Sequence, residues 1–308
     1  MSSVLYPLCF DPILKERIWG SEKWILSGLE GSNSMVSNGL FAENEINELI
    51  ETYLGDLVGD SVYQRFGDEF PLLVKTLHIQ DYLSFQVHPS DAIAKERHHA
   101  YGKAEVWYVL DAEPDAKIYL GFNRPMNPND FVRRCQNQTL PEVMNEITPC
   151  AGDCLYIPPG TVHAAGGGLT VAEIQQTSDI TYRVFDWGRE FYKETAREMH
   201  TELALDAIEW EAFSLPQPEP VVEGVQKLAA TPWFHLSKHF VTQPLILSNT
   251  FGSSFRLLVC VSGQAAVTAH QPVLLKKGEC ALIPAAVGEY SVTPAGSPCH
   301  LLEAWVPL

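Results

Sequence analysis

Residues 152–164 read GDCLYIPPGTVHA, and residues 278–290 read GECALIPAAVGEY. Both stretches begin with Gly, an acidic residue and Cys, and both reach Ile-Pro after a short apolar run, at a constant offset of 126 residues. A short apolar run that ends in a Pro-containing turn is typical of a buried β-strand. The repeat therefore predicts two related β-sandwich lobes in one chain.

The two copies differ where the turn ends, with His163 in the first and Glu289 in the second. Cys154 and Cys280 occupy equivalent positions, which favours a core-filling role for both thiols. The later segment FRLLVCVSGQAAVTAH contains no Q-x-H or H-x-H pattern. We therefore expect the second lobe to be free of metal and the chemistry to lie in the first.

Four residues of the first lobe could meet at one metal ion. Gln86 and His88 alternate in SFQVHP, so a strand there would point both side chains to one face. Glu105 opens EVWYVL, a second predicted strand, and His163 ends the turn PPGTVH. Imidazole and carboxylate groups are ligands for a borderline cation such as zinc. Their order matches that of the ligands in a cupin barrel, with Gln86 where the first His would stand.

The composition is that of an ordinary globular protein. The chain has 308 residues, of which 46% are hydrophobic, enough for one large or two modest domains with ample core. No apolar run approaches the roughly 20 residues that span a bilayer, so we expect no membrane association. The N-terminus MSSVLYPLCFDP lacks a basic region followed by an apolar stretch, and we expect no signal peptide.

The net charge and the cysteine content indicate which partners and which redox compartment to expect. A formal charge of −17 argues against nucleic acid as a partner, because phosphates would be repelled. An anionic substrate would need a local basic pocket, which screening over about 8 Å permits. The 7 cysteines form no C-x-x-C pattern and are typical of reduced thiols in a cytoplasmic protein.

Helical patterns are few, so the predicted fold class is mainly β, with two cupin-type β-sandwich (jelly-roll) lobes and a small helical part. Apolar residues recur at helical spacing over residues 46–58. The stretch 139–142 resembles a capping box that opens a short helix, with Val143 and Met144 facing inward. A further helical stretch is predicted over residues 191–210.

The Pro-rich segment LPQPEPVVEG, residues 215–224, is predicted to be a linker. It divides the chain into a metal-binding catalytic lobe with helical insertions, residues 1–214, and a second, metal-free cupin-like lobe, residues 225–308.

Other histidines and glycines are not expected to be ligands. His98 and His99 lie in the polar segment KERHHAYG and are predicted to be loop residues that flank the pocket. His78 and His235 are interpreted as structural, and residues 166–168, a run of three glycines, as a flexible turn beside the metal.

Five motifs in order resemble the short bacterial form of the type I mannose-6-phosphate isomerases, over nearly the whole chain. They are RIWGSEKW (17–24), FPLLVKTLHIQDYLSFQVHPSD (70–91), GKAEVWYVL (102–110), GDCLYIPPGTVHAAG (152–166) and SDITYRVFDWGR (178–189). The resemblance implies a duplicated cupin barrel with one zinc ion per chain in the N-terminal barrel.

The five motifs also indicate which residues of this chain correspond to the site residues of the family. The resemblance implies the zinc ligands Gln86, His88, Glu105 and His163. It implies Arg183 and Lys103 as catalytic residues, and Lys75, Asp179 and Trp19 as substrate-binding residues.

The implied reaction interconverts mannose 6-phosphate and fructose 6-phosphate through a cis-enediol, by moving a proton between C1 and C2. Lys103 and Lys75 are candidates for the general base if burial near zinc lowers a pKa, and the residues alone do not decide between them. Arg183 stays protonated, which suits charge stabilisation or phosphate binding. We expect a monomeric cytoplasmic enzyme whose partner is a small sugar phosphate.

Two alternatives remain at this point. The first is a non-catalytic regulator that binds a sugar phosphate on the same duplicated cupin scaffold, because fold does not imply function. The second is a cupin that uses iron for dioxygen chemistry, or one that isomerises another sugar phosphate.

Overall fold

Two compact units make up the chain in the computed structural model, which describes residues 5–194, 196–215, 220–249 and 254–307. One unit, here called lobe A, comprises Leu14–Lys23 and Lys75–Gln217. The other, called lobe B, comprises Met1–Ile13, Trp24–Val74 and Pro218–Leu308.

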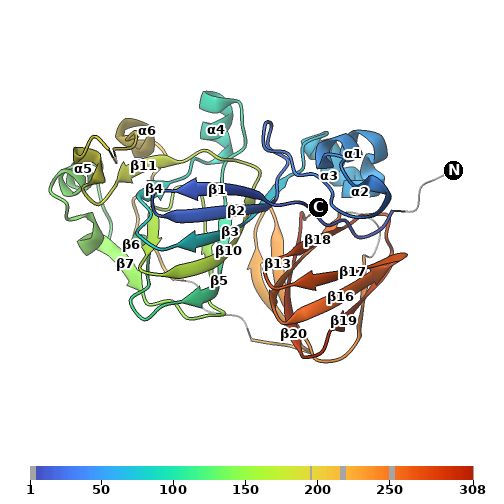
Figure 1. Ribbon diagram of the computed structural model, residues 1–308. Coiled ribbons are helices and arrows are strands. Elements are labelled where there is room, and N and C mark those ends of the chain that lie inside the picture. The colour runs from blue at the N-terminus through green and yellow to red at the C-terminus, as the bar shows by residue number, and fades with distance from the viewer. Residues whose placement is uncertain (1–4, 195, 216–219, 250–253, 308) are drawn as a thin grey trace. The chain divides into compact units, whose positions relative to one another are not determined.

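Lobe A is built on two antiparallel sheets that carry most of the residues expected in the site (Figure 1). Its larger sheet has the order β1-β2-β3-β10-β5-β8: β1 (Ile13–Arg17), β2 (Gly20–Leu26), β3 (Leu72–Ile79), β10 (Leu169–Gln176), β5 (Glu105–Ala112) and β8 (Cys154–Ile157). Its smaller sheet has the order β11-β4-β9-β6-β7: β11 (Tyr182–Phe185), β4 (Phe85–Val87), β9 (His163–Gly166), β6 (Lys117–Phe122) and β7 (Met144–Ile147).

Lobe B repeats the two-sheet plan with other strands, so the mainly β fold class with two sandwich lobes is confirmed. One sheet has the order β12-β13-β20-β15-β18: β12 (Val225–Ala230), β13 (His235–Val241), β20 (Cys299–Trp305), β15 (Arg256–Ser262) and β18 (Cys280–Ile283). The other has the order β14-β19-β16-β17: β14 (Leu245–Ser248), β19 (Glu289–Pro294), β16 (Gln264–Ala269) and β17 (Gln271–Lys276).

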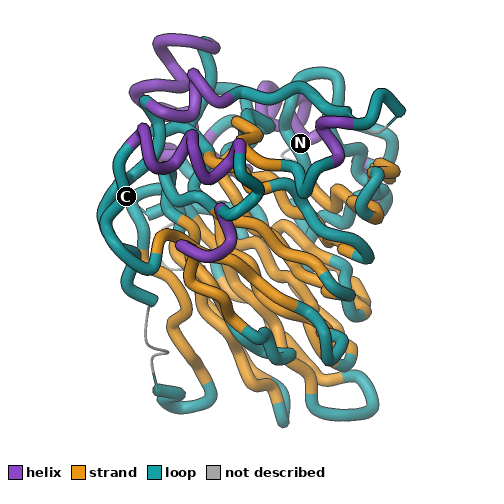
Figure 2. Tube along the Cα trace, turned by 90° about the vertical axis from the view of Figure 1, so that its left-hand side faces the viewer, coloured by secondary structure: helices purple, strands orange, loops and turns teal. Residues whose placement is uncertain are grey.

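Short helices complete each lobe and lie at the ends of strands (Figures 1 and 2). Those of lobe A are α4 (Asp91–His98), α5 (Pro128–Gln136), η2 (Leu140–Val143), η3 (Arg189–Phe191) and α6 (Thr201–Leu205). Those of lobe B are η1 (Gly39–Phe41), α1 (Ile46–Tyr53), α2 (Gly55–Val58) and α3 (Asp60–Phe66). Within the described ranges, no helix combines the length and the apolar character that a membrane span requires.

The core of lobe A lies between its two sheets. Alternate residues of the larger sheet, among them the fully buried Trp107 and Val109, meet Ile118 and Leu120 of β6 in one apolar cluster. Burial of these side chains stabilises the sandwich by about 1.5–3 kcal/mol each. The same packing fixes where the strand ends project, and those ends carry the polar residues of the site.

The internal repeat is confirmed by the strands that it produces. Cys154 opens β8 and Cys280 opens β18, and both side chains are at least half buried. His163 opens β9, and Glu289 opens β19 as its exposed counterpart. The two copies therefore form equivalent strands and differ in the residue that follows the turn, His163 in one and Glu289 in the other.

The helix predicted over residues 46–58 is interrupted. Leu54 has a φ of 50°, and it separates α1 from α2. Positive φ is costly for a branched residue. The apolar spacing nevertheless identified most of the inward positions: Ile46, Ile50 and Leu57 are fully buried, whereas Leu54 is 43% exposed.

The stretch 139–142 forms the short helix η2, with Val143 and Met144 buried, but the Thr139 side chain makes no capping hydrogen bond. The helix predicted over 191–210 is wrong for most of its length, since only η3 and α6 form there. Backbone groups of this segment bond to other elements in place of a helical ladder. Glu198 O accepts from Arg183, for example.

The observed division between the lobes differs from the boundaries expected from the sequence. Residues 24–74 belong with lobe B because their apolar side chains pack there. The Phe70 ring lies 4.8 Å from that of Phe255, and Phe255 N donates to Val58 O at 3.0 Å. The predicted linker 215–224 lies partly outside the described residues.

Candidate metal and substrate site

Three strand ends of lobe A bring four predicted ligands together. β4 carries Gln86, and His88 follows directly after it. Glu105 is the first residue of β5 and His163 the first of β9. Among the described residues, His88, Glu105 and His163 form the group of His, Cys, Asp or Glu side chains that could hold a metal, with ligand atoms within 4.8 Å of one another.

Main-chain carbonyls orient both imidazoles. His88 Nδ1 lies 3.0 Å from Ile180 O, and His163 Nδ1 lies 2.9 Å from Thr161 O. Each carbonyl can accept only from a protonated Nδ1, which leaves the lone pair on Nε2. Such second partners are typical of metal-binding histidines, because they fix the tautomer and the ring orientation.

The Nε2 atoms point at the Glu105 carboxylate, and Lys103 Nζ also lies 3.1 Å from His88 Nε2. His88 Nε2 lies 3.5 Å from Oε2, and His163 Nε2 lies 3.2 Å from Oε1. Two donors held by one tetrahedral zinc ion would lie about 3.3 Å apart. Both oxygens of Glu105 are buried, and Oε2 also lies 2.6 Å from Lys103 Nζ. The trio therefore fits a divalent cation.

The Gln86 side chain reaches the same place. Gln86 pairs with His163 across β4 and β9, and its Nε2 lies 3.2 Å from His163 Nε2. Rotation of the amide about its last torsion would present the oxygen atom in the same direction. Gln86 can therefore complete a set of four ligands, as the family resemblance implies.

Protonation in the trio also suits metal binding. Burial and the neighbouring Lys103 ammonium lower the pKa of His88 to about 3. Burial alone would raise the pKa of Glu105, but the charges of Lys103 and His88 hold it well below its usual range. Neutral imidazole and ionised carboxylate are the forms that metal ions bind.

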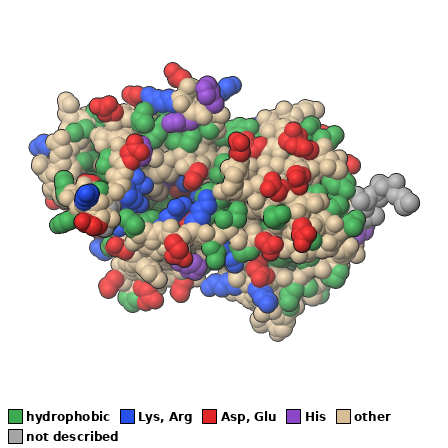
Figure 3. All heavy atoms as spheres, turned by 45° about the horizontal axis from the view of Figure 1, so that its top comes forward, with side chains coloured by type: hydrophobic (Ala, Val, Ile, Leu, Met, Phe, Trp, Pro, Cys, Tyr) green, Lys and Arg blue, Asp and Glu red, His purple; other side chains and the backbone are tan. Residues whose placement is uncertain are grey.

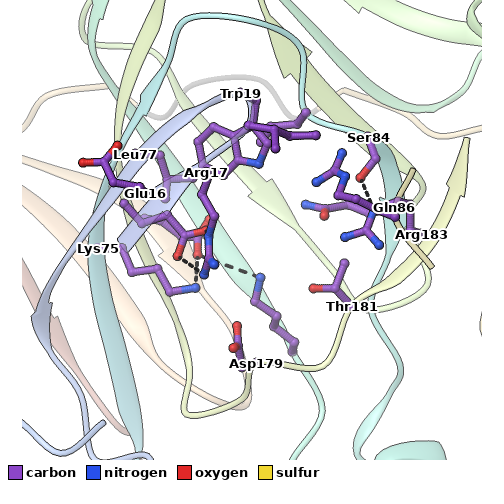
Figure 4. Close-up of a pocket in the computed structure, with 16 residues that line it drawn as sticks. Glu16, Arg17, Trp19, Lys75, Leu77, Ser84, Gln86, Asp179, Thr181 and Arg183 are labelled. Atoms are coloured by element: carbon purple, nitrogen blue, oxygen red, sulfur yellow. Dashed lines mark hydrogen bonds and ion pairs between the residues drawn. The ribbon is translucent and has the colours of Figure 1, made fainter. Parts of the chain in front are cut away.

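A cavity of about 480 Å³ opens beside the trio (Figure 4). Both basic and acidic side chains line it, and Figure 3 shows a group of Lys and Arg side chains near the middle of the face that it draws. The polar side chains that line the cavity belong to Glu16, Arg17, Glu22, Lys75, Ser84, Gln86, Lys103, Glu173, Asp179, Thr181, Arg183 and Arg197.

Lys75 and Lys103 are buried at the floor of this cavity and share the carboxylate of Glu173. Glu173 Oε1 lies 3.2 Å from Lys75 Nζ and 3.8 Å from Lys103 Nζ, while its Oε2 accepts from Trp107 Nε1 at 2.8 Å. Lys103 Nζ is also 2.6 Å from Glu105 Oε2. Lys103 thus lies beside the candidate metal ligands, although β5 begins only at Glu105.

Two carboxylates act on the pKa of Lys103 in the opposite direction to burial. Burial alone would lower the pKa, but the carboxylates of Glu105 and Glu173 raise it above its usual range. These carboxylates favour the ammonium form of Lys103, which can act as a cation or hydrogen-bond donor.

Arg183 lies across the cavity from Lys75 and Arg17 (Figure 4). Its Nε donates to Ser84 Oγ at 3.2 Å, and its Nη1 donates to Glu198 O at 2.7 Å. These acceptors are neutral, whereas Arg17 pairs with the carboxylate of Glu22. The guanidinium charge of Arg183 can therefore act on a bound anion. Burial and the charge of Arg197 lower the pKa of Arg183, but an arginine stays protonated at neutral pH.

The remaining predicted residues lie at the rim and the wall. Trp19 lies in the turn between β1 and β2, is 5% exposed, and its carbonyl accepts from Gln80 N and Asp81 N. Asp179 is exposed and lines the same cavity. The cavity thus includes both residues, together with Lys75, Gln86, Lys103 and Arg183.

His98 and His99 do not lie in a loop, as expected, but at the C-terminal end of helix α4. His98 Nε2 bonds to Tyr182 OH at 2.7 Å, so this histidine already has a structural partner. His235 packs its ring against Trp305, at 5.4 Å between centroids.

Comparison with known proteins places this site in a family. The family described as "Phosphomannose isomerase type I, catalytic domain" matches residues 11–120, and "Mannose-6-phosphate isomerase, cupin domain" matches residues 225–298. The chain is 31% identical to mannose-6-phosphate isomerase ManA of Bacillus subtilis, over 93% of this chain and 95% of that protein. The chain belongs to the type I mannose-6-phosphate isomerase family. The family resemblance stated from the five motifs is thereby confirmed.

Relatives of this isomerase family agree in sequence and in structure. The mannose-6-phosphate isomerase of Streptococcus mutans is 28% identical over 90% of this chain and 92% of its own length. A crystal structure of the Bacillus subtilis mannose-6-phosphate isomerase superposes with a TM-score of 0.84 at 26% identity, covering 97% of this chain and 99% of that one. A structure from Archaeoglobus fulgidus, at 19% identity and a TM-score of 0.81, shares the fold.

Sequence reasoning missed several residues of the cavity in this family member. Glu173 had a usable signal, because a charged residue inside the otherwise apolar and amide-bearing strand LTVAEIQQ must have a buried partner. Ser84, Thr181 and Arg197 had no such signal in the sequence, because small polar residues and arginines are common in any surface loop.

Proposed function

We propose that the chain is a zinc-dependent aldose–ketose isomerase that interconverts mannose 6-phosphate and fructose 6-phosphate through a cis-enediol. The observation that supports this most is the His88–Glu105–His163 trio at the edge of a cavity lined by Lys75, Lys103 and Arg183. Membership in the isomerase family supplies the substrate. The arrangement supplies a site for a cation and, beside it, a place for an anion.

The residues favour zinc among the divalent cations. Two imidazole nitrogens, one carboxylate and an amide make a mixed N/O set that suits a borderline ion. When bound, zinc would supply a Lewis acid that stabilises negative charge on the sugar oxygens.

Arg183 is the group that we assign to the phosphate. Its partners Ser84 and Glu198 O hold the guanidinium in place without neutralising it. A planar guanidinium binds phosphate oxygens through charge-assisted hydrogen bonds.

Glu173 is the residue that we propose as general base. It is 2% exposed, lines the cavity, and its Oε1 lies 3.2 Å from Lys75 Nζ. A carboxylate there could take the proton from C2 of the open-chain aldose and return it to C1, while the hydroxyl proton on O2 passes to O1. Lys103 in its ammonium form would stabilise the charge that develops on the oxygens.

Deuterium at C2 of mannose 6-phosphate tests this proton-transfer chemistry. Transfer through a side-chain base predicts a primary isotope effect on kcat/KM, and partial loss of the label to water during turnover. Complete retention of the label at C1 of fructose 6-phosphate, with no exchange under any condition, would indicate hydride transfer and contradict the proposal.

We further propose that the enzyme acts as a cytoplasmic monomer, with catalysis confined to the first lobe. Every residue that lines the cavity comes from lobe A. All seven cysteines are free thiols, as expected in a reducing compartment.

A further inference from the structure

Arg183 lies on an exposed edge of the smaller sheet, where its main chain needs a partner. β11 is the end strand of that sheet and pairs with β4 on one side only. Arg183 lies opposite Gln86 in that pairing. On the other side, the N–H and C=O groups of an edge residue have no strand to bind.

His200 takes the place of the missing strand. Its main-chain N donates to Arg183 O at 2.8 Å, and its Nδ1 accepts from Arg183 N at 3.2 Å. One residue thereby supplies both the donor and the acceptor that a neighbouring strand would supply. In His200 the side-chain acceptor Nδ1 lies two bonds from Cβ, close enough to the main-chain N–H for one residue to make both hydrogen bonds. Asn and Asp carry an acceptor at the same distance from Cβ.

We infer that His200 is a positioning residue that holds Arg183 in line with Gln86 and the metal ligands; this rests on the proposed function. The main chain of Arg183 is fixed between Gln86 on β4 and His200 on the other side. The side chain starts from that fixed point and reaches Ser84 and Glu198 O. Loss of the imidazole acceptor would let the edge strand shift, and a bidentate anion contact tolerates little displacement.

The segment before His200 has contacts of its own to lobe A, and these contacts hold His200 in position. Arg197 Nε donates to the buried carboxylate of Asp186 at 3.0 Å, and Arg197 Nη2 forms an ion pair with the same carboxylate. His200 itself precedes helix α6, and Ala204 N donates to His200 O at 2.9 Å. The carbonyl of Glu198, two residues earlier, is the acceptor for Arg183 Nη1. The run from Arg197 to His200 therefore holds both the main chain and the side chain of Arg183.

A matched pair of substitutions separates this role from packing. His200→Phe keeps a flat ring beside Tyr182 but replaces Nδ1 by carbon, whereas His200→Asn loses the ring but keeps an acceptor at the same distance from Cβ. His98→Phe is the control, because it breaks the bond to Tyr182 OH in the same strand without touching Arg183.

The zinc-loaded variants are compared for KM and kcat with mannose 6-phosphate, for zinc content, and for the Kd of inorganic phosphate by calorimetry. We expect His200→Phe to raise KM and the phosphate Kd at least tenfold, with kcat changed less than threefold and zinc content unchanged. His200→Asn should restore both constants to within threefold of the wild type, and His98→Phe should leave them unchanged.

An unchanged KM and phosphate Kd in His200→Phe would overturn the inference, as would equal losses in the Phe and Asn variants. If His200→Phe does not fold, His200→Gln moves the acceptor one bond outward and is held to the same tenfold criterion. A wild-type protein that binds phosphate but does not isomerise mannose 6-phosphate would refute the proposed function alone, and the phosphate series would still decide on His200. Absence of phosphate binding in the wild type, together with an unchanged KM in the variants, would refute the inference.

Discussion

Arg256 occupies the position in lobe B that Glu105 occupies in lobe A. Glu105 lies opposite Ile157 between β5 and β8, and Arg256 lies opposite Ile283 between β15 and β18. The repeat makes the two isoleucines equivalent. A metal-ligand candidate in one lobe is thus a cation in the other, which would repel a divalent ion.

The polar residues around Arg256 stabilise lobe B internally. Its guanidinium lies over the Trp305 ring at 4.5 Å, and its Nε lies 3.7 Å from Glu303 Oε1. Glu303 also binds His239 Nε2 at 2.7 Å and accepts from Tyr290 OH at 3.0 Å. Among the described residues, the group of His, Cys, Asp or Glu side chains that could hold a metal is the His88–Glu105–His163 trio of lobe A.

Replacement of a predicted ligand should remove the metal. We expect His163→Ala to lower zinc affinity more than about 100-fold and to abolish measurable isomerase activity, because Nε2 is lost from the trio. Zinc content by atomic absorption and unfolding by circular dichroism are the measurements. His239→Ala is the matched control, a buried histidine of lobe B whose loss should leave zinc content unchanged. Full zinc content in His163→Ala would refute the ligand assignment.

Loss of Arg183 should affect substrate binding and leave the metal in place. A hydrogen bond to a charged group contributes about 1.5–3 kcal/mol, so Arg183→Ala should lower kcat/KM by roughly 10- to 100-fold. Steady-state kinetics and zinc content are compared with those of Arg133→Ala, an exposed arginine on α5. Loss of zinc in Arg183→Ala would show a structural role for this arginine.

Glu173→Gln should lower kcat while zinc and phosphate binding persist. Removal of a general base costs about 10²- to 10⁴-fold in rate, and glutamine keeps the shape and the bond from Trp107. Single-turnover kinetics with zinc-loaded protein measure the effect. Glu146→Gln, at an exposed ion pair with Lys117, is the control. A kcat within twofold of the wild type would contradict the general-base role and leave Glu173 with its ion pair to Lys75 alone.

The stability of the protein should depend on Glu303 in acid. Burial alone would raise the pKa of Glu303, but His239, Arg256 and Tyr290 lower it below its usual value. A carboxyl whose pKa is lower in the folded state binds fewer protons there than in the unfolded chain. Its contribution is therefore complete above the unfolded pKa of about 4.3, and is lost as the pH falls through the folded value.

Glu303→Gln should accordingly flatten the decline in the free energy of unfolding below about pH 4.3. Urea unfolding at a series of pH values measures this slope. Glu289→Gln, an exposed carboxylate on the same lobe, provides the comparison. Identical slopes in the wild type and Glu303→Gln would mean that the Glu303 cluster does not couple folding to protons.

Much of the fold, and the proximity of His88, Glu105 and His163, could be predicted because both depend on local pattern. The repeat around Cys154 and Cys280 marked equivalent strands, and the alternation of Gln86 and His88 gave a shared face. Strand ends are short and rigid, so residues at them keep the orientation that the pattern implies.

The features that the sequence did not predict depend on contacts between segments that are distant in the chain. Leu54 breaks a regular helical pattern, and the residues around Glu198 bond to Arg183 and not to a helix. The pKa of Lys103 is raised by Glu105 and, in addition, by Glu173, which comes from a different strand. Such pairings depend on the folded arrangement, and spacing along the chain does not encode them.

The conversion of mannose 6-phosphate to fructose 6-phosphate by purified protein, before and after chelation and after zinc is restored, tests the central claim most directly. We predict that chelation abolishes the conversion and that about one equivalent of zinc per chain restores it. Folded, zinc-loaded protein that leaves mannose 6-phosphate unchanged, or activity that survives complete removal of metal, would contradict the proposal.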